Sequence, residues 1–242
     1  MKIPEGFGLL PASLAWLRNW KTRLCGRTST RSELANSSTQ APILDRVFPQ
    51  SAPARLLPEE RRSLLELAKK SIAAAARKLD PPEFDASKTS ANLLQPSGCF
   101  VTLHINGKLR GCIGQIFPRS PLYLAVMNHA RNAATSDPRF APVQPGEVDR
   151  AEIEISVLSE PQPLEFDSPE ALLAQLTPLA DGVVLQIDGR IATFLPQVWA
   201  GIPQKVTFME SLSRKAESDP DAWRSPDAGV STYQAESFTL RP

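Results

Sequence analysis

The fold of this chain depends on one stretch, Leu109-Arg110-Gly111-Cys112-Ile113-Gly114, and on the run before it, Cys99-Phe100-Val101-Thr102-Leu103-His104-Ile105. The earlier run is rich in β-branched and aromatic residues, which suit a pleated sheet. Asn106 and Gly107 separate the two runs, and both residue types tolerate the positive φ of a two-residue type I′ turn. The sequence therefore predicts a β-hairpin that returns over residues 108–115.

The register of this hairpin follows from the length of its turn. A tight turn places Leu103 opposite Arg110 and Val101 opposite Cys112, and directly opposed residues point to the same side of a sheet. Arg110 and Cys112 are therefore expected on one face with Cys99, Val101 and Leu103. The other face carries Phe100, Thr102, His104, Leu109, Gly111 and Ile113. Since both faces hold apolar residues, we expect the hairpin to be covered on both sides.

The returning strand has a functional and a structural interpretation. In the functional one, Leu109 to Gly114 line a binding cleft, where Arg110 receives a carboxylate or phosphate and Gly111 and Gly114 expose peptide N–H groups. Cys112 would then be a candidate catalytic nucleophile or redox group. In the structural one, Arg110 makes an ion pair, Cys112 is a small buried hydrophobe and the glycines allow tight packing. Residue spacing alone leaves both open.

These residues also carry a resemblance. The hexapeptide, preceded by Gly98-Cys99-Phe100-Val101-Thr102-Leu103, resembles the AMMECR domain family, also called AmmeMemoRadiSam system protein A. The resemblance extends over about residues 57–240. Where the family usually continues Lys-Ala-Gly-Leu, this chain has Lys215-Ala216-Glu217-Ser218, which leaves the end of that helix open. Further matches are Pro118-x-x-Pro121-Leu122, Asp137-Pro138-Arg139-Phe140, the strand Glu152 to Leu158, Asp181-Gly182, Leu195-Pro196-Gln197-Val198, and Lys215-Ala216 before Trp223.

The resemblance implies an α+β fold of two unequal lobes, with a mostly antiparallel sheet flanked by helices and the central hairpin lining a cleft. It also implies membership in a multi-protein system with a Memo-type protein, itself similar to extradiol dioxygenases, and a radical SAM enzyme. RNA modification has been proposed for the family. No cofactor is expected to be bound by this chain itself.

Composition limits the classes of function. The chain has 242 residues, 42% hydrophobic and 22% charged, which is typical of a soluble globular protein. The formal net charge of +1 gives no electrostatic argument for nucleic acid, although an anionic small ligand remains compatible with Arg110. An odd count of three cysteines fits a reducing, cytoplasmic compartment. Two histidines do not favour a metal site, and no apolar run is long enough to span a membrane.

The order of the expected elements sets the fold class. Residues 1–56 are expected to form a disordered or weakly structured N-terminal tail, and residues 57–242 the AMMECR domain. The sequence lacks regular βαβ alternation, so an α+β class with mostly antiparallel strands is predicted. Helices are expected over 58–79, 121–136 with Ser120 as N-cap, 169–176 and 205–216, and strands over 151–158, 181–187, 190–194 and 233–240.

Other candidate residues complete the set of hypotheses. His129 falls on the apolar face of its helix, where a core histidine with satisfied nitrogens is expected and a catalytic role is the alternative. Glu154 is a candidate partner for Arg110. Three functions stay open. They are an accessory binding component, an enzyme in which Cys112 is the nucleophile and Asp137 or a water is the base, and an RNA-binding protein.

Overall fold

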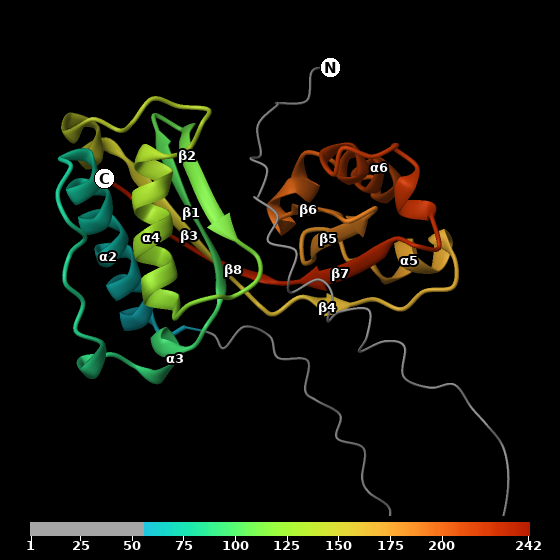
Figure 1. Ribbon diagram of the computed structural model, residues 1–242, viewed down its shortest axis with the longest axis horizontal. Coiled ribbons are helices and arrows are strands. Elements are labelled where there is room, and N and C mark those ends of the chain that lie inside the picture. The colour runs from blue at the N-terminus through green and yellow to red at the C-terminus, as the bar shows by residue number, and fades with distance from the viewer. Residues whose placement is uncertain (1–55) are drawn as a thin grey trace, which may run out of the picture. The chain divides into compact units, whose positions relative to one another are not determined.

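The computed structural model describes residues 56–242. They form two antiparallel four-stranded sheets with flanking helices, which confirms the α+β class (Figure 1). The predicted tail over residues 1–56 lies outside the described residues apart from Leu56. The first sheet has the order β2-β1-β3-β8, with β1 Gly98–Ile105, β2 Lys108–Gln115, β3 Glu152–Leu158 and β8 Ala235–Leu240. The second has the order β4-β7-β5-β6, with β4 Gln162–Pro163, β5 Gly182–Ile187, β6 Arg190–Phe194 and β7 Gly229–Tyr233.

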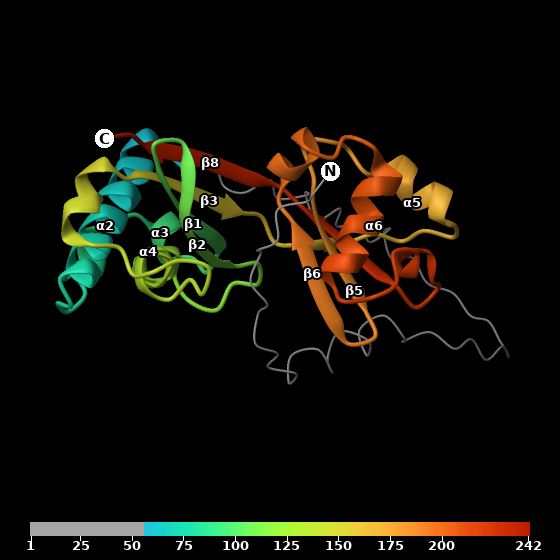
Figure 2. The same cartoon turned by 90° about the horizontal axis from the view of Figure 1, so that it is seen from above.

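Two long helices cover one face of the first sheet, namely α2 (Pro58–Ala76) and α4 (Leu122–Thr135) (Figures 1 and 2). Alternate residues of the strands point at these helices and form the first core, because successive side chains of a strand point to opposite faces. Helix α2 ends before the predicted Leu79, since Lys78 adopts a positive φ of 58°. The buried residues of this core include Leu64, Ile72, Cys99, Val101, Leu103, Val126, Ala130, Ile153 and Ile155.

The hairpin forms with the predicted turn but not with the predicted register. Asn106 and Gly107 have φ values of 52° and 71°, as a type I′ turn requires. A bulge between Leu103 and His104 shifts the pairing beyond it, so Thr102 rather than Val101 lies opposite Cys112. The prediction that Cys112 shares a face with Val101 and Leu103 is therefore wrong. One extra residue moves every later side chain to the other face of the sheet.

The chain passes from the first sheet to the second and back through two extended segments. The sequence predicted a single final strand over residues 233–240, whereas the structure has β7 and β8, separated by Gln234 alone. Gln234 accepts a hydrogen bond at its carbonyl oxygen from the Ser159 N–H (2.9 Å), and its own N–H donates to Ser159 Oγ (2.9 Å). This crossing ties the two passages together. Around it lies a small apolar cluster of Ile116, Leu158, Val184 and Tyr233.

The second sheet has a core of its own, built with α5 (Pro169–Gln175) and α6 (Lys205–Lys215). Trp199 stacks on Phe208 of α6 with ring centroids 3.5 Å apart. We call the two sheets with their helices the first and the second lobe. The remaining short helices are η1 Ala86–Lys88, α3 Ala91–Leu94, η2 Pro145–Arg150, η3 Pro196–Ala200 and η4 Ala222–Arg224. Within residues 56–242, none of the helices combines the length and apolar character needed to cross a membrane.

The departure from the family pattern at Glu217 has a backbone explanation. Helix α6 ends at Lys215, and Glu217 adopts a positive φ of 56° just beyond it. The Ser218 N–H then donates to the carbonyl oxygen of Ser213 (3.0 Å), which closes the last turn. Glycine is the usual residue at this left-handed position. This chain therefore has the same helix-ending backbone conformation, but with a residue, Glu217, that is less favourable there.

Candidate functional site

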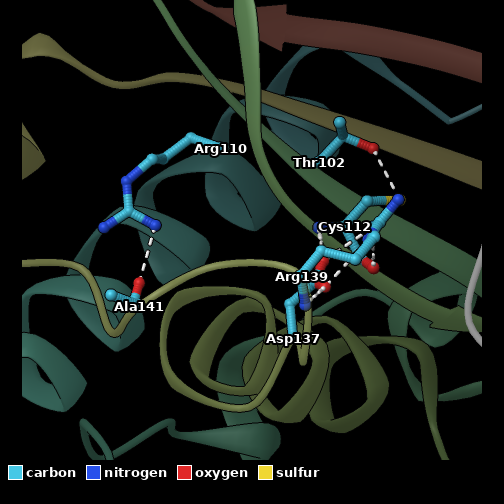
Figure 3. Close-up of polar contacts among 6 residues, drawn as sticks. All are labelled: Thr102, Arg110, Cys112, Asp137, Arg139 and Ala141. Carbon is cyan, nitrogen blue, oxygen red and sulfur yellow. Dashed lines mark hydrogen bonds and ion pairs between the residues drawn. The ribbon is translucent and has the colours of Figure 1, made fainter. Parts of the chain in front are cut away.

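Cys112 lies on β2, which is an edge strand of the first sheet. Its N–H donates to Asp137 Oδ2 (2.8 Å), and its carbonyl oxygen accepts from Arg139 Nη2 (3.4 Å) (Figure 3). A carboxylate and a guanidinium thus occupy the backbone groups that a further strand would use. The Asp137-Pro138-Arg139-Phe140 turn therefore caps the sheet edge at Cys112 and holds its backbone in place.

The outward direction of these backbone groups decides where the thiol points. Because the Cys112 N–H and C=O face away from β1, Thr102 and Cys112 form a non-hydrogen-bonded pair, in which the side chains approach closely. Thr102 Oγ1 donates to Cys112 Sγ at 3.3 Å (Figure 3). Thr102 also lies opposite Glu154 of β3. The thiol therefore belongs to a polar row, on the face of the sheet opposite to the packed core.

Asp137 is the buried anion of this arrangement, with an exposed fraction of only 4%. It accepts from Arg139 Nε on Oδ1 (2.9 Å) and from Arg139 Nη2 on Oδ2 (2.6 Å). Burial alone would raise the pKa of Asp137, but the hydrogen bonds from Arg139 and from the Cys112 N–H outweigh it and lower that pKa. Asp137 is consequently a fixed carboxylate and a poor proton acceptor. This weakens the earlier suggestion that Asp137 is the base for Cys112.

The Cys112 thiol is half-buried, and burial raises its pKa above the ordinary value. Thr102 and Arg139 act in the opposite direction by stabilising the thiolate, whereas Asp137 and Glu154 disfavour it. At neutral pH the group is therefore a neutral thiol. A resting thiolate nucleophile is not what this environment favours.

The second lobe contributes side chains to the same place. The Lys215 ammonium lies within electrostatic range of both Cys112 and Arg139, and its Nζ donates to the carbonyl oxygen of Thr193 on β6 (2.8 Å). Gln197 Nε2 donates to Glu154 Oε1 (3.5 Å) and to Ser237 Oγ (3.2 Å). We call this group the Cys112 cluster, and it consists of Thr102, Cys112, Asp137, Arg139, Glu154, Gln197 and Lys215.

Arg110 takes part in a different arrangement. Its Nε and Nη2 donate to Glu147 Oε1 (2.9 Å) and Oε2 (3.0 Å). Its Nη1 donates to the carbonyl oxygen of Ala141 (2.8 Å) (Figure 3). The expected pairing of Arg110 with Glu154 is wrong, because the bulge moves Arg110 out of line with β3. Arg110 instead ties the loop after α4 to the sheet, which is the structural alternative that the sequence left open.

The two glycines of the hexapeptide are also explained by packing. A Cβ on Gly111 would overlap the carbonyl oxygen of Ala133, so the glycine lets α4 approach β2 closely. A Cβ on Gly114 would overlap the Phe100 ring and the Cys99 carbonyl oxygen. Close approach by the chain itself therefore accounts for both positions without a ligand.

His129 differs from its prediction in one respect. It is half-buried on α4, but neither ring nitrogen has a hydrogen-bond partner among the described residues, so the expected satisfied histidine is wrong. Burial lowers the pKa of His129 to about 4. Within the part of the chain that the structure describes, no group of three or more His, Cys, Asp and Glu side chains is placed to hold a metal ion.

Sequence reasoning missed Thr102, Gln197 and Lys215 as members of the site. Gln197 and Lys215 belong to the segments Leu195-Pro196-Gln197-Val198 and Lys215-Ala216, which were noted only as matches to a family. The available signal was that a polar residue stood inside each matched segment. Nothing local shows that these segments meet at Cys112, since they are about a hundred residues away in sequence.

Comparisons with known proteins agree with the architecture. The family model described as AMMECR1 matches residues 65–238. A protein of Methanothermobacter thermautotrophicus is 39% identical over 147 residues, which cover 60% of this chain and 76% of the relative. Protein MK0488 of Methanopyrus kandleri is 34% identical over 197 residues, which cover 76% of this chain and 90% of that protein.

A solved structure gives the same result at the level of the fold. The crystal structure of the uncharacterised protein PH0010 from Pyrococcus horikoshii matches with a TM-score of 0.68 and 29% sequence identity. The match covers 74% of this chain and 95% of that chain. Because the family model spans well over half of the residues, the chain belongs to the AMMECR1 family.

Proposed function

We propose that the Cys112 cluster is the binding site of a non-catalytic accessory component, with the Leu109 to Gly114 strand as one wall of a ligand or partner cleft. The observation that supports this most is convergence. Strands β1, β2 and β3, the turn after α4, and η3 and α6 of the second lobe all place polar side chains around one half-buried thiol. Such convergence between two separate cores is typical of binding sites.

The electrostatics favour binding over covalent catalysis. A cysteine nucleophile needs a thiolate, and burial raises the pKa of Cys112 instead of lowering it. Arg139 and Lys215 supply positive charge beside the thiol, so an anionic small ligand or an acidic partner segment is compatible with the site. A cysteine-dependent enzyme is the second candidate, since Lys215 could accept the thiol proton. RNA binding gains no support from the near-neutral net charge.

The wider role that we propose is that of a cytoplasmic component of a system with a Memo-type dioxygenase-like protein and a radical SAM enzyme. Its support is membership in the AMMECR1 family, together with the described cysteines being free thiols, as in a reducing compartment. The relatives and the solved structure are named without partners or ligands, so this role rests on the resemblance.

Capture of partners from the native cell tests the binding proposal. Tagged wild-type chain is compared with Gln197→Ala and with Gln162→Ala, a matched control on β4, where Gln162 Nε2 donates to the Glu160 carbonyl oxygen. Quantitative mass spectrometry of the captured proteins and small molecules is expected to show a loss of at least about tenfold for Gln197→Ala, which is roughly 1.4 kcal/mol of binding free energy. Gln162→Ala is expected to retain capture.

Cys112→Ala separates the two candidate functions. An accessory site retains its captured species in this variant, because the thiol is one contact among several. Loss of a measured turnover in Cys112→Ala, with capture intact, would instead support the cysteine-dependent enzyme. Equal capture by all variants would remove the binding proposal.

A further inference from the structure

We propose that Lys215 is a carbonyl-reactive amine, and that the Cys112 cluster takes a small aldehyde or ketone as an imine on Lys215 Nζ. This inference rests on the proposed ligand site and gives its chemical class. The amine nitrogen attacks the carbonyl carbon, the C–O bond breaks after proton transfer to the oxygen, and one water leaves as the C=N bond forms. No oxidant, reductant or cofactor is needed for this step.

The placement of Lys215 is the first argument. It stands at the last residue of α6, and its side chain is half-buried instead of extending into water. Its Nζ donates to the Thr193 carbonyl oxygen at 2.8 Å and lies 5.1 Å from the centre of the Phe194 ring. A backbone carbonyl accepts a stronger hydrogen bond from an ammonium than from a neutral amine, but it can accept from either, so this contact persists when Lys215 loses its proton.

The charges around Lys215 are the second argument. Burial, with a smaller contribution from the Arg139 guanidinium, lowers the pKa of Lys215 to about 8, whereas a charged Cys112 would act in the other direction. Since Cys112 is itself kept neutral by burial, that opposing effect is absent at physiological pH. Lysines that form imines are activated in this way, by burial or by a neighbouring cation.

The neighbours of Lys215 are suited to a carbonyl ligand. The Cys112 thiol belongs to the same cluster and can donate a hydrogen bond to the oxygen of a carbonyl or carbinolamine, while the Thr102 hydroxyl donates to its sulfur and the Gln197 amide donates to Glu154 and Ser237. Asp137 accepts hydrogen bonds from Arg139 and from the Cys112 N–H. The cluster therefore places an uncharged donor, the Cys112 thiol, near the Lys215 amine.

Lys205 provides an internal control. It lies on the same helix, and its Nζ also donates to a backbone carbonyl, that of Leu173 (2.7 Å), but it is not part of the Cys112 cluster. Wild-type protein is incubated at pH 7.5 with limiting propionaldehyde and cyanoborohydride, and propylated peptides are quantified over time. A pKa of about 8 against an ordinary 10.5 leaves roughly a hundredfold more neutral amine at this pH. We therefore expect trapping at Lys215 to exceed trapping at Lys205 by on the order of tenfold to a hundredfold.

The pH dependence and one variant complete the test. The trapping rate at Lys215 should rise to a plateau with a midpoint near pH 8, as its lowered pKa requires, and Lys205→Arg should leave that rate unchanged. Equal trapping at the two lysines in folded wild-type protein would overturn the proposal without any variant having to fold. Loss of partner capture in Gln197→Ala together with an unreactive Lys215 would reject the imine and retain the proposed binding site.

Discussion

Two arginines, one on β2 and one in the turn after α4, make almost the same contacts and have different consequences. Arg110 forms a bidentate ion pair with Glu147 and donates to the Ala141 carbonyl oxygen. Arg139 forms a bidentate ion pair with Asp137 and donates to the Cys112 carbonyl oxygen. Both carboxylates of these pairs have lowered pKa values. The surroundings differ, because the side chain of Asp137 is 2% exposed and that of Glu147 is 22% exposed.

The difference shows that the arginine inside the hexapeptide is not the one beside the thiol. Arg110 closes a loop onto its own lobe, whereas Arg139 fixes the backbone of Cys112 and lies within electrostatic range of Lys215 from the second lobe. A charged residue within a specific motif can therefore be structural, while the residue that shapes the chemistry comes from a neighbouring turn.

The largest expected effect concerns Gly111, which lies between the two arginine pairs. In Gly111→Ala the new methyl group would overlap the Ala133 carbonyl oxygen of α4, so we expect a loss of unfolding free energy on the order of 4 kcal/mol. Urea unfolding followed by circular dichroism measures it. Gly146→Ala is the control, because nothing lies near its added Cβ, and it should change stability by less than about 0.5 kcal/mol. Comparable losses in both variants would mean that α4 does not need the glycine.

The two arginine pairs themselves are compared by removing one charge from each. Asp137→Asn leaves Arg139 half-buried without its carboxylate and should cost about 3 kcal/mol. Glu147→Gln weakens a more exposed pair and should cost less than about 1 kcal/mol. The same urea unfolding experiment gives both values. Equal costs would contradict the assignment of the Asp137 pair as the buried one.

Acid stability tests the first lobe beyond these pairs. Burial lowers the pKa of His129 to about 4 from an ordinary 6.5. Between these two pH values the histidine is protonated in the unfolded chain and neutral in the folded chain. Stability is therefore present above pH 6.5 and falls as the pH drops towards 4, by about 2 kcal/mol from this residue once its partial exposure is considered. His129→Leu should flatten the dependence of unfolding free energy on pH between 6.5 and 4.5. An unchanged slope would assign the acid sensitivity to other groups.

A substitution at the end of α6, beside Lys215, is expected to stabilise the protein slightly, in contrast to the destabilising changes above. Glu217→Gly places at the positive φ of 56° the residue that tolerates it best, and should stabilise the protein by about 1 kcal/mol. A rise in thermal midpoint of a few degrees would report it. Lys78, which also has a positive φ after a helix, offers Lys78→Gly as a matched variant in the first lobe. Destabilisation by Glu217→Gly would show that the Glu217 side chain has a role of its own.

The smallest effect is on rates of alkylation, and it compares the two described cysteines. Burial raises the pKa of both Cys112 and Cys99, that of Cys99 to about 12, and Cys99 is fully buried. With iodoacetamide and peptide mapping, Cys112 should react slowly at pH 7 and faster as the pH rises above 9, whereas Cys99 should react only on unfolding. Rapid alkylation of Cys112 below pH 8 would favour the cysteine-dependent enzyme.

Local pattern was sufficient for the elements with strong periodicity or turn chemistry. The Asn106-Gly107 turn, the helix after Ser168 and the strands on either side of Asp188-Gly189 are present as expected, and Ser168 accepts from the Ala171 N–H as an N-cap. The helix predicted after Ser120 begins one residue later, with Pro121 rather than Ser120 as its N-cap. These features depend on residues close in sequence, and local propensities decide them.

The pairing of distant residues could not be obtained in this way. A bulge at Leu103 and His104 depends on how β2 fits against α4 and β1 together, and nothing in the hairpin sequence requires it. The one-residue shift at this bulge places Cys112 opposite Thr102 and leaves Arg110 to pair with Glu147. The periodicity of a strand is two, so an error of one residue reverses the face of everything that follows.

The sequence by itself determined the class of fold, most element positions and the family, because these depend on composition, periodicity and a specific hexapeptide. Only the tertiary structure decided which side chains surround Cys112. Gln197 and Lys215 lie far from it along the chain, and the crossing at Ser159 and Gln234 joins their lobe to the first sheet. Proximity between distant segments is a property of packing, and packing is set by the whole chain at once.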